Sequence, residues 1–363
     1  MQPDQLVYVS GGELGLRRER RDGRFVILDG DGEEVTDEAT LARVQSLRIP
    51  PAWTDVWISA APNSQLQATG HDAKGRRQYL YHPLWRLRRD EEKFNDMLSF
   101  AEQLPAVRAR ARTLLSSERA NRERTLALAV RLLDIGLFRV GWDRYARDNG
   151  HVGLTTLRRE NVSLRGDDVR FDFIAKSGKR RRMTVRDPQS IDVLASLKRR
   201  RGSPQELLVY PSGHAWHRVH AADVNNTLRC WASGPYSAKE FRTWSATVLA
   251  AVALAREHEA GRRGPTAVSR AVRRVSTALG NTPAVARASY IDPRVIAMFD
   301  DDAVIELPSG HHLADTPMWI EESDDGVVVE LPTDVDEDAL RLDVEQRVRE
   351  LIARTPRPRS QAA

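Results

Sequence analysis

The chain has 363 residues, 41% hydrophobic and 29% charged, a composition that suits a globular protein of two domains and excludes an intrinsically disordered chain. Its formal charge of +5 divides unevenly, with +15 on residues 1–300 and −10 on residues 301–363, so either a polyanionic partner or an arginine-rich solvated surface is expected. Cys230 is the single cysteine, which excludes an internal disulfide framework and a cysteine-based zinc site.

Residues 1–90 are predicted to form a small domain built mainly of β-strands. Thr36 is the expected N-cap of a short helix over residues 37–47. The basic turn at residues 72–77 would join two strands into a hairpin with cations at its tip. The predicted strands are residues 24–28, 55–59, 65–69 and 78–82.

From Glu91 the apolar residues follow a helical period, so residues 91–310 are predicted to form a larger, mainly α domain, with the boundary near residues 88–90. A β island inside it predicts a short three-stranded sheet with Lys176 at one hairpin tip, and the fold class is therefore α+β. Gly280 is the expected stop of a helix. The predicted strands are 162–164, 169–174 and 182–185, and the predicted helices are 122–138, 191–200, 221–231, 239–258 and 266–279.

Residues 311–363 form an acidic C-terminal extension that is predicted to end in a helix over Glu337–Arg354. The extension contains no motif, and we expect it to pack on the body of the protein or to limit nonspecific binding of polyanions by charge repulsion. The first residues lack a signal peptide, and no apolar run approaches the roughly 18 residues of a membrane span. We therefore expect a cytoplasmic protein that does not contact a membrane.

The sequence offers little for nucleotide hydrolysis or metal binding. It lacks the G-x-x-x-x-G-K-[ST] pattern of ATPases. His214, His217 and His220 are spaced three apart, but no cysteine or acidic residue accompanies them at ligand spacing. We predict neither a metal ion nor a cofactor.

A tyrosine downstream of basic motifs carries the chemical interpretation. Tyr290 lies nine residues after Asn281, which follows the helix stop at Gly280, and Arg242 lies in the segment before them. A phenol has an ordinary pKa near ~10 and is a weak nucleophile unless cations favour the phenolate. Guanidiniums can do so and can also neutralise a phosphate in forked geometry. Tyr290 and Arg242 therefore suit transesterification of a phosphodiester.

Five motifs in order give the chain a resemblance to the type IB DNA topoisomerases of the poxvirus and bacterial class. They extend over nearly the whole chain and are Gly75–Tyr81, Arg139-Val140-Gly141, Ala175–Lys179, Lys239–Thr243 and Gly280–Tyr290. The resemblance implies the fold of DNA breaking-rejoining enzymes. It also implies relaxation of supercoils through a 3′-phosphotyrosyl intermediate, strand rotation and religation, without ATP or metal.

The resemblance assigns a role to each of five catalytic residues. Tyr290 is the expected nucleophile, and Arg139 and Arg242 are expected to stabilise the charge on the phosphate. Lys176 is the expected acid for the leaving 5′-oxygen, with Arg139 assisting. Asn281 stands where the viral pattern has histidine, and an amide can donate a hydrogen bond but cannot titrate, so it is expected to stabilise charge with activity retained.

Double-stranded DNA is the expected partner, and a monomer clamped around the duplex would suffice because one chain holds the full set of residues. The resemblance also implies a nucleoid-associated location. The residues expected to contact DNA are Gln78, Tyr79, Tyr81, Arg144, Tyr145 and Lys239.

Each of these residues also has a purely structural interpretation. Lys176 could belong to a basic loop, Asn281 could start a helix, and Arg242 could form a surface ion pair with Glu240. Tyr290 could be a buried or capping residue. Tyr79 and Tyr81 share one side of a strand and could face the core.

Two other functions share parts of the pattern. A tyrosine recombinase or integrase has the same kind of nucleophile, but it usually carries His-x-x-Arg where this chain has Lys239–Arg242, and its N-terminal domain is helical. A catalytically inactive DNA-binding protein of the same fold is the second alternative, against which the intact set of residues argues.

Overall fold

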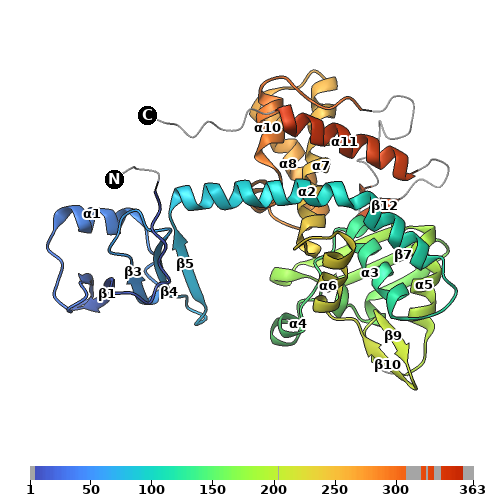
Figure 1. Ribbon diagram of the computed structural model, residues 1–363, viewed down its shortest axis with the longest axis horizontal. Coiled ribbons are helices and arrows are strands. Elements are labelled where there is room, and N and C mark those ends of the chain that lie inside the picture. Colours follow the sequence, from blue (N-terminus) through green and yellow to red (C-terminus); the bar gives the residue numbers. More distant parts are fainter. Residues whose placement is uncertain (1–4, 203, 308–319, 324–325, 331–336, 355–363) are drawn as a thin grey trace. The chain divides into compact units, whose positions relative to one another are not determined.

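The computed structural model describes residues 5–202, 204–307, 320–323, 326–330 and 337–354. The chain divides into two compact units, Met1–Asn95 and Asp96–Ala363. The first unit is built around a β-sheet and the second is largely helical, which confirms the predicted α+β class (Figure 1). In the part of the chain that is described, no helix is long and apolar enough to cross a membrane.

The first unit is a five-stranded antiparallel sheet in the order β2-β1-β3-β4-β5. One helix, α1 (Glu38–Ser46), packs on it through Val44. The cap of α1 is Asp37 and not Thr36, because the Asp37 carboxylate accepts a hydrogen bond from the N–H of Thr40 at 2.8 Å. The strands are β1 (Leu16–Arg21), β2 (Arg24–Leu28), β3 (Thr54–Ile58), β4 (Leu66–His71) and β5 (Arg77–Tyr81).

Strand β1 was not predicted, because the sequence of Leu16–Arg21 is almost entirely charged. It nevertheless lies between β2 and β3 in the sheet, with Leu16 in the core. Backbone pairing with two neighbours determines this strand more than its side chains do.

A single helix, α2 (Pro83–Leu115), leads from the first unit into the second. It begins earlier than the helical period at Glu91 indicates, since proline is well suited to a first helical turn. The boundary predicted near residues 88–90 thus falls inside a continuous helix, and the division between the two units falls after Asn95.

Helices α3 (Arg122–Gly136) and α7 (Ala238–Glu259) are buried on nearly all sides and form the centre of the second unit. Ser237 and Glu240 form a capping box that starts α7. The remaining helices are α4 (Asp143–Asn149), α5 (Pro188–Arg199), α6 (Ala221–Trp231), α8 (Gly264–Leu279), α9 (Pro283–Ser289), α10 (Pro293–Asp300) and α11 (Glu337–Arg354).

The three predicted strands of this unit are present, and the C-terminal extension adds two more. The order is β11-β12-β8-β7-β6, in which β12 runs parallel to β8. A separate hairpin, β9 (Val209–Ser212) with β10 (Ala215–Arg218), was not predicted. The sheet strands are β6 (Val162–Arg165), β7 (Asp168–Ile174), β8 (Arg180–Arg186), β11 (Ile320–Ser323) and β12 (Gly326–Glu330).

The predicted C-terminal helix is confirmed as α11, and a buried ion network joins it to the body. Asp134 of α3 accepts two hydrogen bonds from Arg108 of α2 and two from Arg341 of α11, all between 2.9 and 3.0 Å. Arg108 also binds Glu345 of α11 through two contacts of 2.8 Å. The extension therefore packs on the body, the first of its two expected roles.

Candidate active site

Tyr290 is the C-cap residue of α9. Its N–H donates to the carbonyl of Ala286 at 3.1 Å, and its own carbonyl accepts a hydrogen bond from the hydroxyl of Thr247 on α7 at 3.3 Å. The side chain is half-buried. The backbone of Tyr290 is thus held by two helices, while its phenol remains accessible.

Arg242, near the start of α7, lies beside this phenol. It is 3% exposed, and its guanidinium carbon is 5.2 Å from the centroid of the Tyr290 ring. Its two terminal nitrogens donate to the carbonyls of Leu137 and Leu279, the latter at 3.0 Å. A surface ion pair with Glu240 is therefore the wrong interpretation of Arg242. Backbone carbonyls orient the guanidinium, and no carboxylate of the described residues pairs with it.

Arg139 and Asn281 contact each other within the site. Nη2 of Arg139 donates to the side-chain oxygen of Asn281. Thr282, not Asn281, caps α9, so the helix-start interpretation of Asn281 is wrong. The segment that carries Arg139 packs closely against Gly153. A Cβ on Gly153 would lie 2.5 Å from Cα of Gly141, so this position requires glycine.

The electrostatics of the site favour the phenolate. Burial raises the pKa of Tyr290, but the charge and hydrogen bond of Arg242, with smaller contributions from Arg139 and Asn281, bring this pKa below its ordinary value. Burial and then repulsion by Arg139 lower the pKa of Arg242 to about 10, although Tyr290 opposes the shift. A cationic site of this kind is suited to an anionic group.

Lys176 is not part of this constellation. It begins the short 3₁₀ turn η3 (Lys176–Gly178) between β7 and β8, where it is exposed. The turn is held by the N–H of Gly178, which donates to Nε2 of His151 at 3.2 Å. Among the described residues, no hydrogen bond joins Lys176 to Tyr290, Arg139 or Arg242. The structure brings together four of the five predicted catalytic residues, and the role of Lys176 remains a prediction.

Arg181 is a residue of this site that the sequence analysis missed. It is 8% exposed, and its Nη2 donates to the carbonyl of Ala278 at 2.6 Å. In the sequence, Arg181 is one of several adjacent basic residues that follow Lys176. The alternation of β8, in which Met183 and Val185 are buried, places Arg181 on the same inward face and could have revealed it.

Residues predicted to bind DNA from the first unit lie on β5. Tyr79 and Tyr81 are 44% and 38% exposed, and their rings stack with centroids 6.1 Å apart. They are therefore not core residues. Gln78 donates to the carboxylate of Asp72 at 2.8 Å, which orders the hairpin behind its basic turn.

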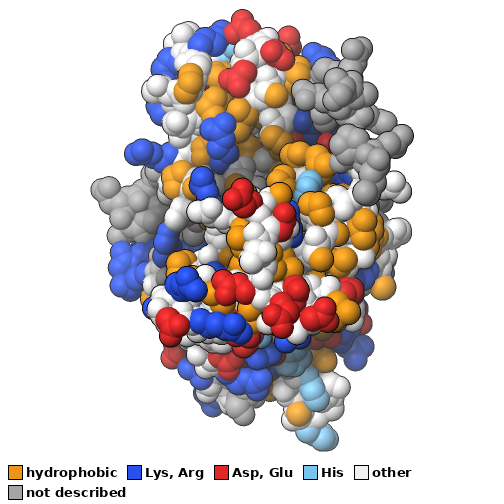
Figure 2. All heavy atoms as spheres, turned by 90° about the vertical axis from the view of Figure 1, so that its left-hand side faces the viewer, with side chains coloured by type: hydrophobic (Ala, Val, Ile, Leu, Met, Phe, Trp, Pro, Cys, Tyr) orange, Lys and Arg blue, Asp and Glu red, His pale blue; other side chains and the backbone are white. Residues whose placement is uncertain are grey.

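The other predicted DNA contacts lie in the second unit. Arg144 of α4 is 86% exposed, with a 3.5 Å ion pair to Asp148. Lys239 is exposed on the first turn of α7. Tyr145 belongs to α4, but its side chain lies outside the described part of the structure. Acidic and basic side chains are interspersed on the face shown in Figure 2, so charge alone does not locate a DNA surface there.

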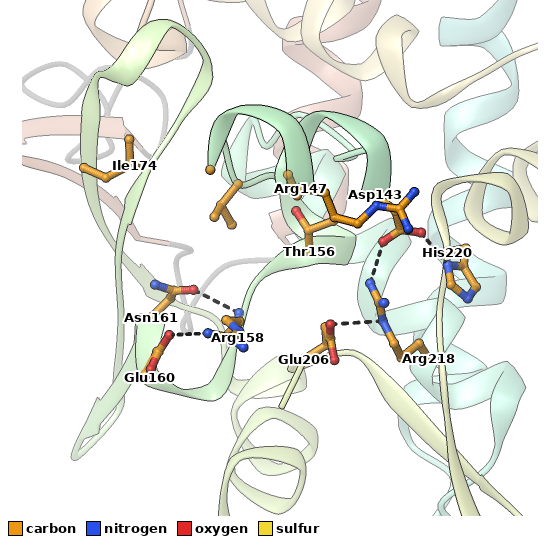
Figure 3. Close-up of a pocket in the computed structure, with 13 residues that line it drawn as sticks. Asp143, Arg147, Thr156, Arg158, Glu160, Asn161, Ile174, Glu206, Arg218 and His220 are labelled. Atoms are coloured by element: carbon orange, nitrogen blue, oxygen red, sulfur yellow. Dashed lines mark hydrogen bonds and ion pairs between the residues drawn. The ribbon is translucent and has the colours of Figure 1, made fainter. Parts of the chain in front are cut away.

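Helix α4 is anchored at its first residue. The Asp143 carboxylate accepts a hydrogen bond from Arg218 at 2.5 Å and contacts Nδ1 of His220 at 2.8 Å (Figure 3). Burial by itself would raise the pKa of Asp143, but the hydrogen bonds and charges of His220 and Arg218 together hold this pKa below its usual range. A cavity of about 660 Å³ lies beside the helix and is lined by both acidic and basic residues. Asp143 thus positions α4, and its carboxylate is engaged within the protein.

Comparison with known families agrees with this site. The model of the eukaryotic DNA topoisomerase I catalytic core matches residues 82–302, which is more than half of the chain. The N-terminal domain of bacterial DNA topoisomerase IB matches residues 24–72. The chain belongs to the type IB DNA topoisomerases. The match at residues 24–72 also decides against the recombinase alternative.

Individual type IB topoisomerases match over different lengths. DNA topoisomerase 1B of Acanthamoeba polyphaga mimivirus is 28% identical over 300 residues, which cover 79% of this chain and 88% of the viral protein. DNA topoisomerase I of monkeypox virus is 19% identical over 299 residues, or 80% and 91%. DNA topoisomerase 1 of Candida albicans is 27% identical over 163 residues, or 44% and 19%.

Proposed function

We propose that this topoisomerase relaxes supercoiled DNA by cleaving one strand with Tyr290 and rejoining it after the strand has rotated. The observation that carries the proposal is the half-buried phenol of Tyr290, whose pKa is lowered by Arg242, Arg139 and Asn281. Cations and a hydrogen bond beside the phenol favour the phenolate, which is the stronger nucleophile.

The proposed cleavage step conserves the energy of the broken bond. After the phenol has lost its proton to solvent, the Oη atom of Tyr290 bonds to phosphorus as the bond to the 5′-oxygen breaks. The electron pair stays on the 5′-oxygen, which takes a proton from Lys176. The 3′-phosphotyrosyl link retains the energy for religation, so ATP is not required. Arg139 and Arg242 neutralise the non-bridging oxygens as charge builds in the transition state.

A monomer clamped around duplex DNA is the proposed complex. Gln78, Tyr79 and Tyr81 would contact the duplex from the first unit, and Arg144, Tyr145 and Lys239 from the second. Arginine, lysine and tyrosine side chains are common phosphate ligands. The exposed ammonium of Lys176 would reach the leaving group once DNA is bound.

The proposed function predicts relaxation of a negatively supercoiled plasmid in EDTA without ATP. Guanidiniums carry out the charge neutralisation that a metal ion would otherwise perform, so the rate is expected to change less than about threefold when magnesium is removed at constant ionic strength. Agarose gels of time points measure the relaxation. A strict requirement for magnesium or ATP would contradict the mechanism.

The role of Lys176 predicts a specific chemical rescue. Lys176→Ala is expected to slow single-turnover cleavage by about 10²- to 10⁴-fold, because the 5′-oxygen then leaves without a proton. A 5′-bridging phosphorothiolate substrate should restore most of that rate, since sulfur departs without protonation. Lys179→Ala, three residues away on the same hairpin, is the control. If Lys176→Ala cleaves the phosphorothiolate no faster than ordinary DNA, Lys176 is not the acid.

A further inference from the structure

A third arginine lies beside Arg139 and Arg242. Arg181 occupies an inward-facing position of β8, where the alternating pattern otherwise buries Met183 and Val185. Burying a guanidinium costs free energy unless hydrogen bonds or an opposite charge compensate for its lost hydration. The position of Arg181 therefore calls for a functional explanation.

The guanidinium of Arg181 packs on the turn that follows α8. Its Nη2 donates to the carbonyl of Ala278, and its Nη1 would lie 2.8 Å from a Cβ on Gly280. Gly280 is the C-cap of α8 and has φ +64°, a left-handed conformation that favours glycine. Nε of Arg181 has no hydrogen-bond partner among the described residues.

The same turn is held at three points by three arginines. Arg181 binds the carbonyl of Ala278, Arg242 binds that of Leu279, and Arg139 binds the side chain of Asn281. The two carbonyls belong to the C-terminal end of α8, where the helix dipole attracts cations. The turn thus sets the spacing between the guanidiniums.

The charge of Arg181 is not balanced by a carboxylate in the described part of the chain. Burial, followed by repulsion from Arg242 and Arg139, lowers the pKa of Arg181 to about 9. Mutual repulsion means that the three guanidiniums would separate if the turn did not hold them. Their geometry therefore depends on the hydrogen bonds that hold them in place, three of which are made to this turn.

We propose that Arg181 is a positioning residue for DNA cleavage, which holds the Ala278–Asn281 turn so that Asn281 keeps Arg139 beside the phenol of Tyr290. This inference rests on the proposed function and adds a residue to it. Arg181 acts through the turn and is not assigned a contact with DNA.

The test is single-turnover cleavage of a short duplex by Arg181→Met at saturating protein. Methionine fills similar space without the charge, so thermal stability is expected to stay the same or rise. The cleavage rate constant should fall about 100-fold, the size of effect that a misplaced catalytic group produces. DNA affinity, measured in a Tyr290→Phe background, should change less than about threefold.

The pH profile separates positioning from a purely structural role. Arg139 and Asn281 lower the pKa of Tyr290 in the wild type, so releasing them should raise this pKa and move the rise of the cleavage rate to higher pH in Arg181→Met. Arg182→Met, the neighbouring exposed position of β8, makes the same charge change on the opposite face and should leave rate and profile unchanged.

A double-mutant cycle tests the route through Asn281. If Arg181 acts by placing Asn281, the two substitutions remove the same contribution. The cleavage rate constant of the double variant Arg181→Met/Asn281→Ala should then lie within about threefold of that of the slower single variant. If instead the fold losses of the two single variants multiply in the double variant, Arg181 does not act through Asn281. Arg181→Lys keeps a positive charge and can donate one hydrogen bond, so it should cleave about tenfold faster than Arg181→Met. If the methionine variant does not fold, the lysine variant is compared with the wild type instead.

The outcomes separate this proposal from the proposed function. If the wild type forms no covalent adduct with DNA, the proposed function fails. If the wild type cleaves and Arg181→Met matches it in rate and pH profile, the proposed function stands and the positioning role of Arg181 is overturned.

Discussion

Tyr290→Phe is expected to abolish both plasmid relaxation and the covalent DNA adduct, with a loss on the order of 10⁶-fold, as when a covalent nucleophile is removed from an enzyme. The substitution deletes one oxygen atom. The ring can keep its place 5.2 Å from the guanidinium of Arg242, and the backbone contact to Thr247 does not involve the side chain. Folding and DNA binding should therefore be retained. Denaturing gels of protein mixed with labelled duplex measure the adduct.

Tyr236→Phe is the matched control for this experiment. Tyr236 is another half-buried tyrosine of the second unit, but burial and nearby acidic residues raise its pKa. Its loss should leave adduct formation unchanged. An active Tyr290→Phe variant would refute the nucleophile assignment. A variant that no longer binds DNA would show that the phenol oxygen serves binding as well as chemistry.

The sequence predicted the candidate site to the extent that local pattern determines it. The helix stop at Gly280 follows from glycine chemistry over a few residues and is confirmed. Which groups surround the phenol depends on contacts between distant segments. Arg139 meets Asn281 across 142 residues, and Arg181 meets Ala278 across 97. Local pattern contains no direct information on such contacts.

The fold shows the same division between local and distant determinants. Period-two alternation predicted β7 and most of β8, and the helical period predicted α6 and α7 closely. The pairing of β12 with β8 joins segments that are far apart in the sequence, since Val327 pairs with Met183, and composition described the extension only as acidic. The charged strand β1 was missed because its pairing partners, not its own residues, place it in a sheet.

Glu345→Gln in α11 is expected to lower the free energy of unfolding of the second unit by about 3–5 kcal/mol. Glu345 is 5% exposed, and it shares Arg108 with Asp134 in a network that also contains Arg341. In the wild type two carboxylates balance two guanidiniums, and this balance holds the pKa of Asp134 well below its usual range despite burial. Replacing Glu345 leaves one carboxylate for two buried cations. Urea denaturation followed by circular dichroism measures the loss.

Asp343→Asn, two residues away on the same helix, is the matched control. Asp343 forms an ion pair with Arg347 at 2.9 Å, but its side chain is 45% exposed, so its removal should cost no more than about 1 kcal/mol. If both variants lose the same free energy of unfolding, the buried network is not what attaches α11 to the body. A large loss for Glu345→Gln alone would make the acidic extension a structural part of the catalytic unit. Asp134 lies near the end of α3, immediately before the turn whose Leu137 carbonyl orients Arg242. Cleavage should therefore decline along with stability when this attachment is weakened.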